Sequence, residues 1–240
     1  MFGSFASGVS IHYGPSAITN PSRQHITPKL IVGQRLTPQV IIGAADANPV
    51  NIQDLCPADT RFKILVFAGD LTRIKQKERL NRLAAAMSKP EGFVKKFGRP
   101  RHNKEGEWDL FDLIPICAGK KELVNHLDIP KSLRTHWSKW VTPLLPIYTT
   151  SLVLLFFLLT KGTICVDRVY LDDTDTTSKK GGQAYSTYGI DPYAGAIVVI
   201  RPDGYAGIVT SLENLSDLDA YFSAFMVPRS PVSTLTFARL

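Results

Sequence analysis

The sequence predicts an α/β domain in which helices flank a mixed β-sheet, and three local patterns carry this prediction. Residues 62–67 and 197–200 are short, mostly apolar runs rich in β-branched and aromatic side chains, as in buried strands. The Pro-Asp-Gly sequence at 202–204 is a turn signal, and residues 206–210 return from it as the second strand of a hairpin. A terminal helix is expected from Ser216, whose hydroxyl can cap the helix ahead of acidic residues.

Similar patterns place further strands in the first half of the chain. Strands are expected at Val40–Gly43 and, more briefly, at 51–55. The run that begins at Phe62 extends to Ala68 and is the clearest strand of this half. Asp70 follows it directly, and we interpret this residue as a strand end or a helix cap.

Helical spacing of apolar residues predicts two amphipathic helices. The first covers residues 74–87, with an apolar face formed by Ile74, Leu80, Leu83 and Met87. The second is the terminal helix, whose apolar side chains are Leu215, Leu218, Tyr221, Phe222 and Phe225. Residues 109–117 lie between the two helices, are mostly apolar and are bracketed by polar residues, so we expect another strand there.

The composition indicates one folded domain, with or without extensions. The chain has 240 residues, of which 44% are hydrophobic and 10% aromatic, enough to bury a core. A net charge of +7 could indicate a nucleic-acid partner. Most of this charge, however, is confined to residues 73–104, without an RNA-binding signature or zinc-ligand spacing. We therefore interpret the basic stretch as a solvated helix and loop face and expect no nucleic-acid partner.

The three cysteines do not form a redox motif. Cys56, Cys117 and Cys165 lie far apart, and a Cys-x-x-Cys pair is missing from the sequence. Cys56 is part of a Leu-Cys-Pro-Ala-Asp segment that could suggest a peroxidase. A peroxidatic thiolate needs a helix N-terminus and a nearby cation, whereas this segment is expected to be a loop leading into a strand. We expect the cysteines to have no catalytic role.

Two other groups of polar residues could suggest a site. His12 and Tyr13 resemble catalytic groups, but the neighbouring sequence supplies no partner for them. The acidic residues Asp172, Asp173 and Asp175 could bind a cation, but the lysines at 179–180 and the absence of spaced oxygen ligands favour a solvated loop. The residues alone therefore predict no catalytic, cofactor-binding or metal-binding residue.

Residues 140–168 are unlike the rest of the chain. Between residues 140 and 160 the sequence carries no charge, a length at the lower edge of what spans a bilayer. Lysines flank this run on both sides and give no orientation, and Pro143 and Pro146 would break the first turns of a helix. Three interpretations stay open: a membrane helix, a buried insertion, or translated sequence from a retained intron.

The C-terminal part of the chain resembles a known family. Residues 169–173 read Val-Tyr-Leu-Asp-Asp, residues 181–192 read Gly-Gly-Gln-Ala-Tyr-Ser-Thr-Tyr-Gly-Ile-Asp-Pro, and residues 195–205 read Gly-Ala-Ile-Val-Val-Ile-Arg-Pro-Asp-Gly-Tyr. These sequence segments resemble the C-terminal domain of the flavin-dependent phenol 2-monooxygenases. Patchier matches occur at 33–38, Gly-Gln-Arg-Leu-Thr-Pro, and at 130–139, which ends in His-Trp-Ser-Lys.

The resemblance implies a thioredoxin-like fold without redox cysteines, at the dimer interface of those enzymes. It divides the chain into 1–32, a remnant of the seam with the flavin domain, and 33–139 plus 169–228, the thioredoxin-like domain. Residues 229–240 form a C-terminal tail. In the family the His-Trp-Ser-Lys sequence passes almost directly into Val-Tyr-Leu-Asp-Asp, so residues 140–168 interrupt it. The clean junction at 169 makes a retained intron our preferred interpretation of that apolar insertion.

The expected function follows from what the family has and this sequence lacks. The family uses FAD and NADPH, but the Gly-x-Gly-x-x-Gly turn that holds the FAD pyrophosphate is absent from this sequence. We therefore expect a non-catalytic, cytoplasmic dimerisation module that binds no cofactor and associates with itself or with a flavoprotein monooxygenase subunit. Its interaction patch would contain Val9, Ile11, Tyr13 and Ile18.

Two other functions stay open. The first is a truncated FAD-dependent monooxygenase that hydroxylates aromatic compounds, in aromatic catabolism or secondary metabolism. The second is an accessory protein tethered to a membrane through residues 140–160.

Overall fold

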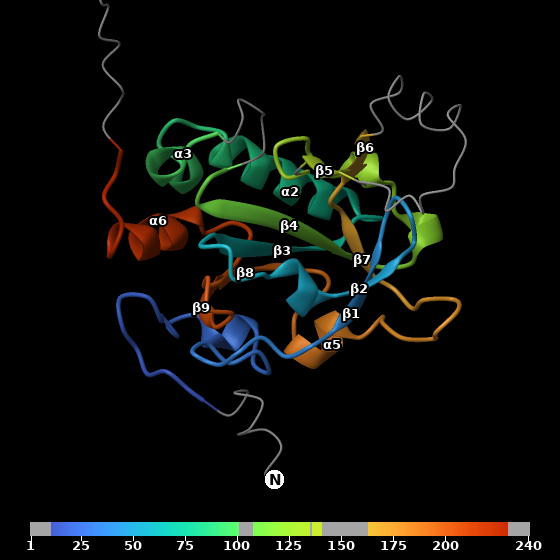
Figure 1. The fold of residues 1–240 in the computed structure, drawn as a ribbon, viewed down its shortest axis with the longest axis horizontal. Coiled ribbons are helices and arrows are strands. Elements are labelled where there is room, and N and C mark those ends of the chain that lie inside the picture. The colour runs from blue at the N-terminus through green and yellow to red at the C-terminus, as the bar shows by residue number, and fades with distance from the viewer. Residues whose placement is uncertain (1–10, 101–107, 135, 141–162, 230–240) are drawn as a thin grey trace, which may run out of the picture.

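A computed structural model describes residues 11–100, 108–134, 136–140 and 163–229. Its centre is a seven-stranded mixed sheet with helices on both faces (Figure 1). From one edge to the other, the strands are β2 (Pro49–Asn51), β1 (Val40–Gly43), β7 (Tyr170–Asp172), β4 (Phe111–Ala118), β3 (Phe62–Asp70), β8 (Ala196–Ile200) and β9 (Ala206–Thr210). The predicted α/β class and mixed sheet are confirmed.

The middle of the sheet has the connectivity of a thioredoxin-like domain. Strands β3 and β4 are parallel and are joined through α2 (Ile74–Met87) and the short α3 (Phe93–Phe97). Strand β8 runs antiparallel to β3, β9 is antiparallel to β8, and α6 (Leu215–Ser223) follows β9. The predicted hairpin at 202–204 is therefore present.

Each face of the sheet packs into its own apolar core, because side chains alternate along the buried strands. Helices α2, α3 and α6 cover one face, where Phe222 stacks on Phe93 and meets Phe111 edge-on at centroid distances of 5.2 and 5.0 Å. The other face is covered by α5 (Ala184–Tyr188), by η2 (Ile52–Leu55) and by residues 30–36.

Neither edge of the large sheet offers a long free strand. Along β9, the backbone of residues 19–36 forms hydrogen bonds: Asn20 N donates to Gly207 O at 2.7 Å, and Gly33 N donates to Ala206 O at 2.8 Å. We call residues 11–36 the strap; they include the 3-10 turn η1 (Gln24–Ile26). At the opposite edge β2 has only three residues and begins with proline, which cannot donate a backbone hydrogen bond.

Three predicted details differ in the structure. Residues 52–55 form the 3-10 helix η2 rather than a strand, because the Asn51 side chain accepts from Gln53 N at 3.1 Å and turns the chain. Helix α6 begins at Leu215, with Asn214 rather than Ser216 at the N-cap position. Helix α2 has the predicted bounds, but Ile74 is 74% exposed and does not join Leu80, Leu83 and Met87 in the core.

The predicted insertion lies mainly outside the described residues. Strands β5 (His136–Trp140) and β6 (Thr163–Asp167) form a separate antiparallel pair in which Trp140 lies opposite Thr163. Residues 141–162 between them are not described, so the interpretations of 140–168 and the division of the chain into domains stay predictions. In the part of the chain that the structure describes, no helix is both long and apolar enough to cross a membrane.

Candidate functional site

The turn from β3 into α2 is where a redox-active thioredoxin-like domain would carry its Cys-x-x-Cys pair. Here the turn consists of Leu71, Thr72 and Arg73. Asp70 ends β3, as predicted, and its carboxylate accepts from Thr72 N at 3.0 Å and from Thr72 Oγ1 at 2.7 Å. The turn is thus held by an Asp-Thr contact and carries no thiol.

Cys56 lies just after η2 and is half-buried. Burial raises the pKa of the Cys56 thiol to about 12, although the nearby Lys63 charge acts in the opposite direction. Cys117, in the middle of the sheet, is fully buried and its pKa is likewise raised to about 12. Because the thiolate is the reactive form, these two thiols are poor nucleophiles at neutral pH. The side chain of Cys165 lies outside the described residues.

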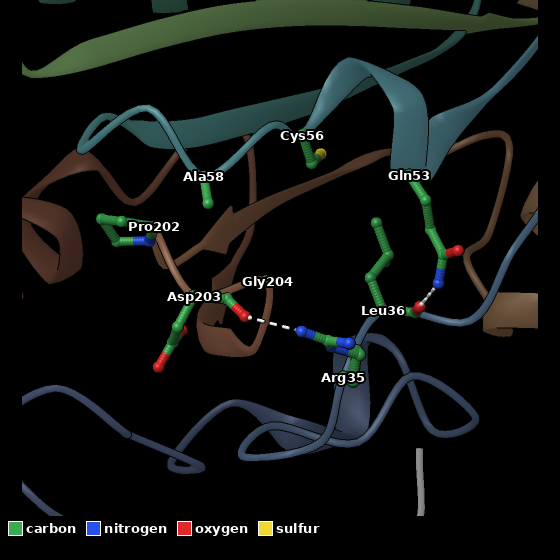
Figure 2. Close-up of a pocket in the computed structure, with 8 residues that line it drawn as sticks. All are labelled: Arg35, Leu36, Gln53, Cys56, Ala58, Pro202, Asp203 and Gly204. Atoms are coloured by element: carbon green, nitrogen blue, oxygen red, sulfur yellow. Dashed lines mark hydrogen bonds between the residues drawn. The ribbon is translucent and has the colours of Figure 1, made fainter. Parts of the chain in front are cut away.

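A hollow of about 290 Å³ opens beside Cys56, between η2 and the β8–β9 turn (Figure 2). Its longest polar side chains are already engaged with backbone carbonyls. Gln53 Nε2 donates to Leu36 O at 2.7 Å, and Arg35 Nη2 donates to Asp203 O at 3.3 Å. The hollow is therefore a recess between the strap and the hairpin. Because the pKa of its Cys56 thiol is raised, this thiol does not supply a nucleophile.

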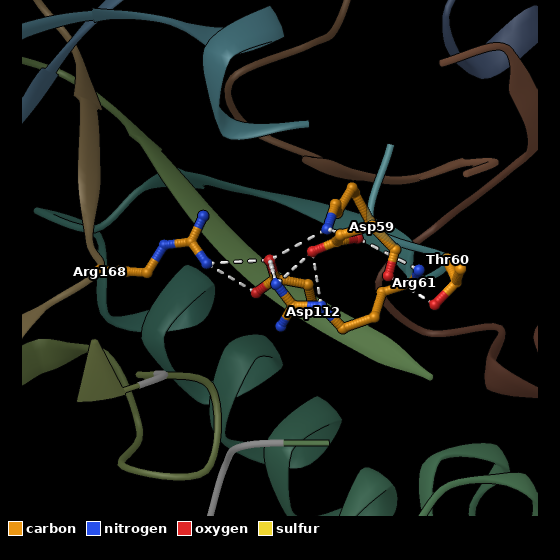
Figure 3. A network of polar contacts seen from close by, with 6 residues as sticks. Asp59, Thr60, Arg61, Asp112 and Arg168 are labelled. Atoms are coloured by element: carbon orange, nitrogen blue, oxygen red, sulfur yellow. Dashed lines mark hydrogen bonds and ion pairs between the residues drawn. The ribbon is translucent and has the colours of Figure 1, made fainter. Parts of the chain in front are cut away.

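A cluster of charged side chains lies on the same face of the sheet (Figure 3). Asp112 in β4 and Lys63 in β3 lie opposite each other in the strand register, and both are almost completely buried. Arg168 Nη1 donates to Asp112 Oδ1 at 2.8 Å and to Oδ2 at 2.9 Å, and Lys63 Nζ lies 3.4 Å from Oδ2. Asp59 accepts from Lys63 Nζ at 2.6 Å and from Arg61 Nη2 at 2.5 Å.

The pKa values of two members of this cluster, Arg168 and Asp59, are shifted toward the charged form. Burial alone would lower the pKa of Arg168, but the charges and hydrogen bonds of Asp112 and Tyr170 together outweigh burial, and the pKa is raised. Partial burial would raise the pKa of Asp59, but hydrogen bonds from Arg61 and Lys63 lower it to about 2. The ion pairs of this cluster join strands β3 and β4 to the segment before β7, so the cluster acts as a structural clamp.

The acidic residues at the end of β7 and just after it accept hydrogen bonds from backbone groups. The predicted solvated loop is therefore wrong for these carboxylates. Both oxygens of Asp172 accept from the first residues of α5, Ala184 N and Tyr185 N, each at 2.9 Å. Burial raises the pKa of Asp172, against these two bonds. Asp173 Oδ2 accepts from Lys121 N at 2.9 Å. The described residues contain no group of three His, Cys, Asp or Glu side chains that could hold a metal ion.

The strap places His12 and Tyr13 in structural contacts rather than beside catalytic partners. His12 Nε2 lies 3.1 Å from Val32 O, within the strap itself. Tyr13 meets Tyr205 edge-on at 4.8 Å, and the Arg201 guanidinium lies 5.1 Å from the centre of the Tyr13 ring. Ile11, Tyr13 and Ile18 of the predicted patch are 41%, 44% and 36% exposed, and Val9 lies outside the described residues.

Several cations of the basic stretch pair with acids of the same chain. Lys77 Nζ lies 2.9 Å from Asp128 Oδ2, and Arg79 Nε lies 3.1 Å from Glu213 Oε1. Such pairs are expected of a solvated helix face. The absence of a nucleic-acid partner stays a prediction.

Comparison with protein families matches residues 11–154 and 152–230 to the family described as phenol hydroxylase, C-terminal dimerisation domain. The chain belongs to this family. The resemblance seen in the sequence is thus confirmed, and with it the assignment as a dimerisation domain. The seven-stranded sheet agrees with the thioredoxin-like fold that the family resemblance implied.

Curated relatives of this dimerisation domain are flavin-dependent and phenol monooxygenases. An FAD-dependent monooxygenase of Aspergillus terreus is 28% identical over 92% of this chain and 32% of its own length. A phenol 2-monooxygenase of Aspergillus fumigatus is 24% identical over 91% of this chain and 32% of its own length. A 3-hydroxybenzoate 4-monooxygenase of Comamonas testosteroni is 26% identical over 93% of this chain and 31% of its own length. The chain therefore spans about a third of the length of these relatives.

The dimerisation domain does not offer a fitting site for FAD at its one Gly-Gly helix start. A dinucleotide pyrophosphate needs free backbone N–H groups at a helix N-terminus. At the start of α5, after Gly181 and Gly182, the first two helical N–H groups are already bound by the Asp172 carboxylate. A pyrophosphate would have to displace this internal anion, and α5 is only five residues long.

Proposed function

We propose that this dimerisation domain is a non-catalytic association module of an FAD-dependent aromatic monooxygenase. The family match over residues 11–230 carries the proposal. The chemistry, which needs FAD and NADPH, would belong to a flavin-binding part that corresponds to the other two-thirds of the relatives. The residues of this chain contribute contacts and a rigid sheet, and the clamp of Asp112, Lys63 and Arg168 keeps the parallel strands in register.

The strap fits a role at the seam with the flavin-binding part. The matched family is a C-terminal domain, so in the relatives the flavin-binding part precedes the strap. Ile11, Tyr13 and Ile18 keep part of their apolar surface on water, as expected of a contact with a preceding domain. The relatives equally support the alternative that the full protein is itself a monooxygenase acting on aromatic compounds.

We place the module in the cytoplasm, because Cys56 and Cys117 are free thiols, which is typical of a reducing compartment. Membrane tethering through 140–160 is the alternative, and fractionation of cells that express the full chain separates the two.

Two measurements test the proposed function. Sedimentation equilibrium of the purified full chain at micromolar concentration should give a dimer, and a strict monomer would count against association. The same preparation should be colourless and should not oxidise NADPH when phenols are added. Stoichiometric yellow flavin that stays bound through gel filtration would overturn the non-catalytic assignment.

A further inference from the structure

Three loops meet at one end of the sheet. Helix α2 follows β3, and residues 119–134, with η4 (Lys121–Leu123) and η5 (His126–Asp128), follow β4; these two strands are parallel. Residues 191–195 precede β8. Because β8 is antiparallel to β3, the start of β8 lies beside the end of β3, and residues 191–195 therefore lie at the same end of the sheet as the start of α2. Direct contacts confirm the meeting: the Arg73 guanidinium lies 4.1 Å from the Tyr193 ring centre, and Lys77 Nζ lies 2.9 Å from Asp128 Oδ2.

The end of the sheet where these loops meet carries large apolar side chains that are exposed to solvent. Ile74, Leu123, Leu127 and Tyr193 are 74%, 64%, 61% and 54% exposed. We call these four residues the α2-start face. Among the described residues, Val227 is the one other large hydrophobic side chain that is more than half exposed. Single exposed apolar residues are ordinary, but four on loops at the same end of the sheet point to an interaction surface.

The other surfaces are less suited to a second copy of the chain. The strap covers one sheet edge, and the other edge is the three-residue β2 with its proline, so neither edge favours pairing of the sheets of two copies. The outward side of α2 exposes the charged residues Lys75, Glu78 and Arg82, and charged residues are depleted at the core of interfaces. The strap is where the relatives continue into their preceding part.

The charges around the α2-start face also suit a symmetric pair. Exposed Arg73 and exposed Glu122 border the apolar residues on two different loops. In a two-fold interface residue i meets residue j and residue j meets residue i, so Arg73 of each copy can face Glu122 of the other. Apolar, aromatic and arginine side chains together are also the composition favoured at the centre of interfaces.

We propose that two copies of this chain pair through the α2-start face, with Ile74 and Leu127 near the centre of the contact. This inference rests on the proposed function, because it names the surface by which the module associates. It leaves the strap for the flavin-binding part of the protein, so the two apolar patches of the domain have different occupants.

The test is sedimentation equilibrium of the full chain in three forms. The first is the unchanged chain, the second is Ile74→Ser/Leu127→Ser, and the matched control is Ile11→Ser/Tyr13→Ser in the strap. All four side chains are at least 41% exposed, so thermal unfolding should show that each variant is folded. The Ile74→Ser/Leu127→Ser variant should raise the dimer dissociation constant by about tenfold or more, as expected for central interface residues. The control should stay within about twofold of the unchanged chain, as expected for a surface outside the contact.

Each outcome decides between the proposals. A strict monomer for the unchanged chain would remove both the association function and this inference. An unchanged dimer in the Ile74→Ser/Leu127→Ser variant would overturn the α2-start face alone and leave the association function standing. Equal weakening in both variants, or weakening in the control only, would likewise overturn it.

Discussion

Arg168 holds Asp112 by both carboxylate oxygens, at 2.8 and 2.9 Å from its Nη1, across 56 residues of sequence. Asp112 belongs to β4, before residues 141–162, and Arg168 lies after them, between β6 and β7. The ion pair therefore joins the two stretches that the apolar segment separates. It also neutralises a carboxylate that the sheet buries, with Lys63 and Arg61 as more distant partners at 3.4 Å each.

Replacing Arg168 with methionine should destabilise the domain by about 2–4 kcal/mol, because a buried carboxylate loses its closest partner. The loss of stability should be smaller than for a buried carboxylate with no partner at all, since Lys63 and Arg61 remain close to Asp112. Urea unfolding followed by circular dichroism measures the change. The control is Arg82→Ala, an exposed cation 4.0 Å from Glu213, which should cost at most about 1 kcal/mol. Equal losses of unfolding free energy in the two variants would show that the ion pair of Arg168 and Asp112 contributes no special stability.

Acid should remove part of the stability through Asp59. Its pKa is about 2 in the folded chain, against 3.8 for an unperturbed aspartate, so the folded state favours the ionised form. The contribution is present in full above pH 4 and is lost as the pH falls through about 2. Asp59→Asn should therefore unfold more easily than the unchanged chain at pH 7, and most of this difference in stability should be lost at pH 2. Urea midpoints at pH 7, 4 and 2 test this, with the exposed Glu78→Gln as control.

A gap between Asp59→Asn and the unchanged chain that stays constant across this pH range would contradict the assignment of Asp59 as the ionised partner of Arg61 and Lys63.

Cys56 should react slowly with alkylating reagents. A pKa of about 12, against 9.0 for a free thiol, lowers the thiolate fraction at neutral pH by roughly a thousandfold. Mass spectrometry after iodoacetamide treatment at pH 7.5 should show Cys56 unmodified while a free cysteine in the same tube is consumed. The chain should also lack peroxidase activity, and an activity that Cys56→Ser abolishes would disprove this prediction.

The sequence was sufficient to predict the elements that have a clear local pattern of apolar or turn residues. The apolar run in β3, the helical spacing of α2 and the turn at 202–204 each depend on local chemistry, and the structure contains all three. Ile74 shows where periodicity fails: it has the right spacing for the core, but it is the first residue of its helix and is exposed, whereas Leu80 and Leu83 are buried.

The buried clamp could not be predicted with the same ease. Lys63 and Asp112 are charged residues near the start of two apolar strands, a weak signal that becomes a site only when the strands pair in parallel register. Arg168 reaches them from a distant part of the chain, and sequence spacing carries no information about that contact. The strap and the α2-start face depend in the same way on tertiary contacts.

Residues 141–162 should be replaceable by a two-residue Asn-Gly turn. Trp140 and Thr163 lie opposite each other in the antiparallel β5–β6 pair, so a type I′ turn can join them without moving either strand. The shortened chain should unfold cooperatively within about 4 °C of the full chain, which is about 1 kcal/mol for a domain of this size. Differential scanning calorimetry measures this. A matched deletion of 141–165 also removes residues 163–165 of β6 and should lower the Tm further. Loss of cooperative unfolding in the Asn-Gly variant would show that the domain needs the apolar segment in order to fold.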